Sequence, residues 1–111
     1  MDNQVELKDD QLEITGAGGM TVNITEIESL ELVSELPELS GTGGFSLGLI
    51  KKGNFIRSID QAKVRVIKNS DGKFIVFKYN DQDVYLSLSN SEQTMELYQG
   101  LSESYIKTSA K

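Results

Sequence analysis

Side chains that carry most enzyme chemistry are scarce in this chain. Its 111 residues include no histidine and no cysteine. Tight zinc and copper sites use imidazole or thiolate ligands, and a serine or threonine nucleophile needs a base beside it. The seventeen acidic residues could form carboxylate pairs for acid–base catalysis, but no spacing singles out one pair. We therefore expect a protein that is not an enzyme, with no catalytic residue, no cofactor and no metal site.

Two glycine-rich segments differ from a phosphate-binding loop, which lies between a strand and a helix N-terminus. Gly16-Ala17-Gly18-Gly19 is followed by Met20–Ile24, whose alternation predicts a strand. Gly41-Thr42-Gly43-Gly44 lacks a following Gly-Lys-Ser/Thr. Asp81 and Asp83 fail as the start of a calcium loop, because the sixth position would be Leu86 and not glycine. These segments therefore predict turns.

Two features could bind a partner. Apolar side chains on the glycine-rich segment 45–50 either fold back onto the core or contact another molecule. Basic side chains of the segment 63–78 form either an ordinary solvated strand face or a strip for anions. The candidate partner-binding residues are Phe45, Leu47, Leu49, Ile50, Lys63, Arg65, Lys73 and Lys78, with Lys68 nearby.

Charge is divided unevenly along the chain. The net charge is −6. Residues 1–40 hold ten acids and one base, residues 41–78 hold eight bases and two acids, and residues 79–111 hold five acids and two bases. The acidic excess argues against binding nucleic acid. The basic middle third either neutralises its acidic neighbours within one fold or forms a local positive patch.

Hydrophobic periodicity predicts strands followed by one helix. Residues 40–52 are expected to be irregular because they contain four glycines. A helix over residues 25–36 competes with the fourth strand, and Pro37 ends either element. The predicted strands cover residues 4–8, 11–15, 20–24, 28–33, 54–59, 63–68, 74–79 and 84–88.

Two local signals fix the end of this pattern. Asn69-Ser70-Asp71-Gly72 predicts a hairpin turn that pairs strand 63–68 with strand 74–79. Asn90 as N-cap, with Gln93 three residues later, predicts the start of a helix over residues 91–106. Its apolar stripe contains Met95, Leu97, Tyr98, Leu101 and Tyr105.

The segment 74–77 has apolar residues on both faces, Ile75 and Phe77 on one and Phe74 and Val76 on the other. A small barrel has one interior, so the second face needs a cover. The C-terminal helix could supply it. Otherwise an exposed apolar strip favours a homodimer or a larger assembly.

The chain length predicts a single domain over residues 1–111, with a core at about 3–104 and a frayed tail at 105–111. No apolar run approaches the roughly 20 residues of a membrane-spanning helix. The N-terminus lacks the basic and apolar regions of a signal peptide. We expect a cytoplasmic location, which the absence of cysteine fits.

The segment Ile24–Pro37, the glycine-rich stretch, Gly53-Asn54-Phe55 and Met95-Glu96-Leu97-Tyr98 together resemble the bacterial pleckstrin-homology-like (PH-like) domains. The likeness covers about residues 3–104. It implies a mainly β fold, a seven-stranded, bent antiparallel barrel or sandwich capped by a C-terminal α-helix. It also implies a binding module without known catalytic residues.

The phosphoinositide binding associated with eukaryotic pleckstrin-homology domains does not carry over, because the first loop here is Lys8-Asp9-Asp10-Gln11 and its two acids repel phosphate. We therefore expect a module for protein–protein contact or self-association, with an unknown partner. The alternative is a peripheral binder of anionic lipid or another anionic ligand. It would use the basic hairpin and the Phe45–Ile50 loop, without being an integral membrane protein.

Overall fold

The computed structural model describes residues 3–109, and the side-chain surroundings of all of these except 42, 43, 45, 108 and 109. The described chain is mainly β, with nine strands in two sheets and one C-terminal α-helix. The strands are β1 (Gln4–Leu7), β2 (Gln11–Thr15), β3 (Met20–Asn23), β4 (Ser29–Val33), β5 (Leu39–Leu47), β6 (Ile50–Arg57), β7 (Ala62–Lys68), β8 (Phe74–Tyr79) and β9 (Gln82–Leu86).

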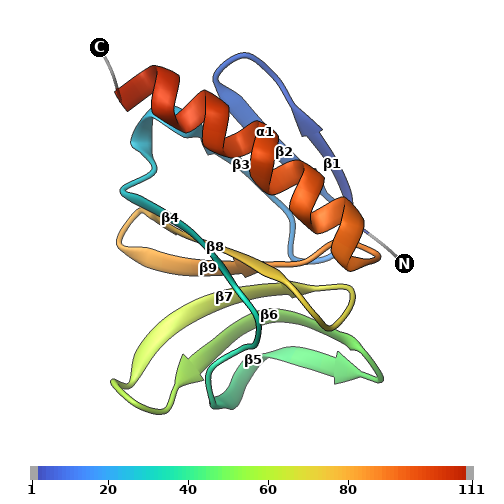
Figure 1. Ribbon diagram of the computed structural model, residues 1–111. Coiled ribbons are helices and arrows are strands. Elements are labelled where there is room, and N and C mark those ends of the chain that lie inside the picture. The colour runs from blue at the N-terminus through green and yellow to red at the C-terminus, as the bar shows by residue number, and fades with distance from the viewer. Residues whose placement is uncertain (1–2, 110–111) are drawn as a thin grey trace.

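The two sheets pack as a sandwich and do not close into a barrel. The small sheet has the order β1-β2-β3, and the large one has the order β4-β8-β9-β7-β6-β5. Figure 1 shows the small sheet and the helix α1 (Ser91–Ser109) on one side of the large sheet, which curls at its β5–β6 end. The mainly β fold with a C-terminal helix is thus confirmed. The barrel form and its seven strands are not what the chain adopts.

The predicted hairpin at 69–72 is wrong. β7 does not pair with β8, because β9 lies between them and pairs parallel to β7 and antiparallel to β8. Asn69 and Ser70 of this segment are buried and bind the chain that follows β9. Ser70 Oγ donates to the Leu88 carbonyl at 2.7 Å, and the Asn69 and Ser70 amides both donate to Ser87 Oγ. These hydrogen bonds hold a crossover, which a local turn signal cannot distinguish from a hairpin.

The expectation of irregular structure over residues 40–52 is also wrong. This segment forms most of the antiparallel hairpin β5–β6, which turns at Gly48 with φ of 59°. Gly44 is required for close approach, because a Cβ there would lie 2.7 Å from the ring of Phe55, which is buried beneath it. The glycines therefore permit strand packing and do not interrupt it.

Both faces of the large sheet carry a core. The first core includes Ile75, Phe77 and Leu101 and lies under the small sheet and α1, whereas the second includes Phe55, Val64, Val66 and Tyr85. Leu36, from the connection between β4 and β5, and Leu39, the first residue of β5, pack against the second core. The second face of β8 therefore packs against the second core, with Leu36 and Leu39, and not against the helix. The apolar strip on which the homodimer hypothesis rested is not exposed, since Phe74 is buried and Val76 is half-buried.

Residues 24–36 contain only the short 3-10 turn Ile24–Glu26 and then β4, so the competing helix there is wrong. Ile27 enters the first core between these elements. α1 ends at Ser109, three residues later than predicted, and Tyr105 packs against the first core.

Candidate docking groove

The position of α1 is set by its first turn. The Asn90 side chain accepts a hydrogen bond from the Gln93 amide at 2.9 Å, as the N-cap pattern predicted. The buried Thr94 hydroxyl accepts from the Leu88 amide at 2.9 Å, which ties the helix to the end of β9. Leu101 is fully buried against the first core. These contacts leave Met95 at the margin of the apolar stripe with 48% of its surface exposed.

The strand opposite this margin is an edge strand. Within the residues that the structure describes, β4 pairs only with β8. Leu30 and Leu32 turn toward the first core, whereas Ser29 and Glu31 alternate with them and are exposed. One edge of β4 is therefore without a strand partner in the described chain, and an open edge can accept another strand.

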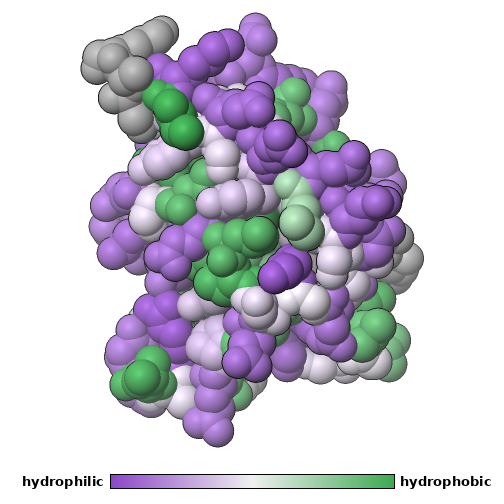
Figure 2. Space-filling view, in the orientation of Figure 1, coloured by the Kyte–Doolittle hydropathy of each residue, from purple (hydrophilic) through white to green (hydrophobic). Residues whose placement is uncertain are grey.

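A groove of about 710 Å³ runs between β4 and α1. Leu32 forms one wall, and α1 supplies the other through Glu92, Met95, Glu96, Tyr98 and Gln99. Figure 2 shows an apolar patch in this region between α1 and β4, surrounded by hydrophilic surface. The groove thus joins an apolar floor to an unpaired strand edge.

The rim of the groove is acidic. Glu92 and Glu96 line it from α1, Glu31 lies on β4, and Glu28 and Glu35 flank that strand; all five are exposed. None of the described residues that line the groove is lysine or arginine. Two bases lie next to β4, Lys73, which donates to Ser34 Oγ, and Lys78, which pairs opposite Ser29. The five acids outnumber them, so this surface attracts cationic side chains and repels anions.

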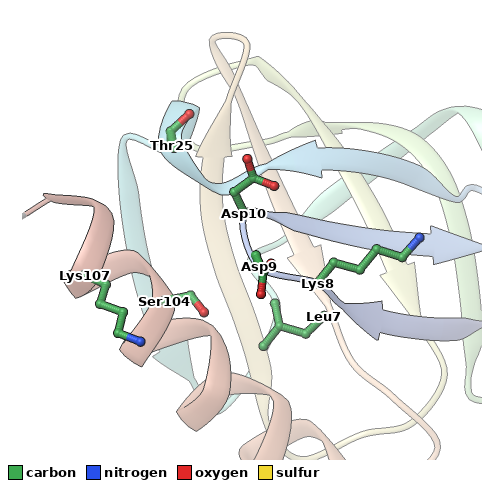
Figure 3. Close-up of a pocket in the computed structure, with 7 residues that line it drawn as sticks. All are labelled: Leu7, Lys8, Asp9, Asp10, Thr25, Ser104 and Lys107. Carbon is green, nitrogen blue, oxygen red and sulfur yellow. The ribbon is translucent and has the colours of Figure 1, made fainter.

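A second cavity of about 720 Å³ lies between the β1–β2 turn and the C-terminal half of α1. Figure 3 shows Asp9, Asp10 and Thr25 around it, with Ser104 and Lys107 on the helix and the Lys8 amine directed away. The carboxylates of Asp9 and Asp10 beside the Lys107 amine do not indicate which kind of ligand would bind in this cavity. In the part of the chain that the structure describes, no group of three or more histidine, cysteine or acidic side chains is arranged so that it could hold a metal ion.

The apolar residues predicted to contact a partner lie at the tip of the β5–β6 hairpin. Leu47 and Leu49 are exposed, at 72% and 55% of their surface, and Ile50 is half-buried. The side chain of Phe45 lies outside the described residues. Lys68 donates to the Leu49 carbonyl at 2.9 Å, and Lys51 donates to Ser46 Oγ at 2.7 Å. The tip is thus apolar, with two lysines behind it.

The predicted basic residues do not form one strip. Arg65 donates to the Gly18 carbonyl at 3.1 Å, and Lys73 donates to Ser34 Oγ at 3.3 Å. Lys63 and Lys78 line a cavity of about 210 Å³ together with three carboxylates, those of Asp60, Asp81 and Asp83. The bases are therefore dispersed and interleaved with acids.

Arg57 is the centre of the ion pairs at this end of the large sheet. Its guanidinium contacts Asp60 at 2.8 Å and Asp83 at 2.7 Å, and it donates to the Tyr85 hydroxyl at 2.9 Å. The hydrogen bonds that Arg57 donates to Asp60, and next to Asp83, raise the pKa of Arg57, and the bond to Asp60 lowers the pKa of that carboxyl group. This network of opposite charges joins β6 to β9.

Sequence reasoning missed the groove, because Met95 was assigned to the buried stripe and the edge position of β4 depends on long-range pairing. The available signal was the concentration of acids in residues 1–40.

No helix in the described residues is long and apolar enough to cross a membrane. Comparison with protein families, with curated proteins and with solved structures gives no match to this chain.

Proposed function

We propose that this protein is a non-enzymatic binding module of the PH-like class that contacts another protein through the groove between β4 and α1. The observation that carries the proposal is the half-exposed Met95 beside an open strand edge. A methionine adapts its shape to a partner, and an apolar patch rimmed by polar residues is typical of an interaction surface. The resemblance of the sequence to PH-like domains supports a role in binding and assembly.

A photo-crosslinking amino acid placed at Met95 tests this proposal in cells, with the same group at Ile59 as the control. Ile59 is 89% exposed and does not line the groove. We expect a discrete protein adduct from position 95 only.

The captured protein is then purified, and its affinity is measured for the wild type, for M95E and for I59E. M95E should weaken binding at least about tenfold, the loss typical of one important interface contact. Equal adducts from both positions, or equal affinities of both variants, would remove the proposal.

A second candidate function has one observation in its favour. Leu47 and Leu49 project from the β5–β6 tip with Lys51 and Lys68 behind them, an arrangement that suits an anionic lipid surface. The ion pair of Lys68 with Asp71 at 2.9 Å weakens that positive charge. Co-sedimentation with phosphatidylserine vesicles tests this candidate. Salt-sensitive binding that is lost in the double variant Leu47→Ser, Leu49→Ser supports it, and unchanged sedimentation of that variant removes it.

A further inference from the structure

We infer that the groove accepts an extended, basic segment of the partner protein as an additional strand on the free edge of β4. This inference rests on the proposed function and specifies the chemistry of the partner. Strand addition to an open sheet edge takes its affinity from main-chain hydrogen bonds and its specificity from alternate side chains.

The geometry places two different surfaces on either side of such a strand. An added strand lies about 4.8 Å from β4, and its side chains alternate between the two faces of the sheet. Side chains on the face of Leu30 and Leu32 enter the groove and meet Met95 and Tyr98. Side chains on the opposite face lie beside Glu31, which is exposed. The site therefore selects apolar residues at alternate positions and tolerates charge between them.

The rim determines the sign of that charge. Glu31 points from β4, Glu92 and Glu96 line the helical wall, and no base lines the groove among the described residues. Opposite charges directly across a strand pair stabilise it by roughly 0.2–1 kcal/mol, and like charges destabilise it. A segment in which lysine or arginine alternates with apolar residues thus matches both surfaces.

The same charges disfavour a second copy of this chain as the occupant. Symmetric antiparallel pairing of two β4 edges centred on Glu31 would oppose that glutamate to its own copy, with Glu28 and Glu35 adding to the repulsion. Charged residues on an edge strand protect it from self-pairing. Protection from self-pairing gives no role to the apolar groove beside the edge, whereas an added strand would place its alternate apolar side chains in it.

Three short synthetic peptides test the inference with the full 111-residue chain. The first alternates lysine with valine, the second replaces each lysine by glutamate, and the third is the lysine peptide with alternate backbone nitrogens methylated to remove their N–H donors. Binding is followed by amide chemical shifts in two-dimensional NMR. Only the first peptide should shift the amide signals of β4 and of residues 92–99, slow hydrogen exchange in β4, and lose affinity as salt is raised.

Matched variants locate the site. E31K and M95E should each weaken the lysine peptide at least about tenfold, whereas E103K, the same charge reversal at an exposed position of α1 outside the groove, should have little effect. Circular dichroism and thermal melting verify that all three variants fold.

Binding of the lysine peptide elsewhere, equal binding to E31K, or equal binding of the methylated peptide would overturn strand addition by a basic segment. If the partner captured through position 95 then still depends on Met95, protein binding at the groove stands and only the occupant is wrong. If that dependence is absent as well, both conclusions fall.

Discussion

The Lys52 ammonium donates a hydrogen bond to the side-chain oxygen of Asn3 inside the protein, across a sequence separation of 49 residues. Lys52 is only 2% exposed and Asn3 only 7%. The Asn3 amide group also donates to the Thr15 and Ala17 carbonyls at 2.8 and 2.9 Å, and its oxygen accepts from Asn69 at 3.1 Å. One asparagine therefore joins the start of the chain to both sheets.

Asn3→Ala should destabilise the protein by about 2–4 kcal/mol. It removes several buried hydrogen bonds, including the one that the Asn3 side-chain oxygen accepts from the buried Lys52 ammonium. Urea unfolding measures this loss. Gln4→Ala, at the exposed neighbouring position, should stay within about 0.5 kcal/mol. Equal unfolding free energies of the two variants would mean that the buried hydrogen bonds of Asn3 do not stabilise the folded protein.

Leu101→Ala should cost about 2–5 kcal/mol, because the side chain is fully buried at the contact of α1 with the first core. Met95→Ala on the same helix should cost less than about 1 kcal/mol, since nearly half of Met95 is exposed. Thermal or urea unfolding compares them. A loss below about 0.5 kcal/mol for Leu101→Ala would contradict the packing of α1 described above.

Gly44→Ala should be clearly more destabilising than Gly41→Ala. A Cβ at position 44 would lie 2.7 Å from the Phe55 ring, whereas a Cβ at position 41 would lie at an ordinary 3.9 Å from it. Overpacking of this kind costs about 1–3 kcal/mol. Chemical denaturation of the two variants checks the difference, and a harmless Gly44→Ala would show that β5 can move away from β6 at little cost.

Acid should reduce the stabilising contribution of the ion pair between Arg57 and Asp60. The hydrogen bond from Arg57 lowers the pKa of Asp60 in the folded state, so Asp60 binds its proton less readily there than in the unfolded chain, where an aspartate titrates near about 3.9. Its stabilising contribution is present above the unfolded-state pKa and is lost as the pH falls through the lower folded-state value.

Asp60→Asn should therefore reduce the fall in unfolding free energy below about pH 4. The effect should disappear when Arg57 is already replaced by glutamine, since the guanidinium is its cause. Urea unfolding as a function of pH measures both comparisons. An undiminished effect in the Arg57→Gln background would assign the acid sensitivity to other carboxylates.

Local patterns predicted a large part of the architecture. Alternating residues located strands at β1, β2, β3, β4, β7 and β9, an apolar run located β8, and Asn90 with Gln93 located the start of α1 to the residue. These predictions succeeded because strand alternation and helix capping depend on residues only a few positions apart in the sequence. The assignment of Leu101 to the core succeeded for the same reason.

Other features depend on residues far apart in the chain. Asn69-Ser70-Asp71-Gly72 has the composition of a hairpin turn, but β9 takes the place beside β7, and the polar side chains bind Ser87 and Leu88 instead. The glycines of residues 41–48 mark a strand and its turn because Phe55 must pack against Gly44. In both cases the partner lies outside the window from which the prediction was made.

Composition and local patterns were enough to predict a mainly β domain with one capped C-terminal helix, a strongly acidic first third, and no histidine or cysteine for chemistry. Contacts between distant residues bury Lys52, disperse the bases of residues 63–78 among aspartates, and leave one edge of β4 beside Met95 without a strand partner in the described chain. Periodicity reports which face of an element is apolar. Which strand is last in a sheet, and which apolar side chain is left uncovered, are set by long-range pairing that no local pattern contains.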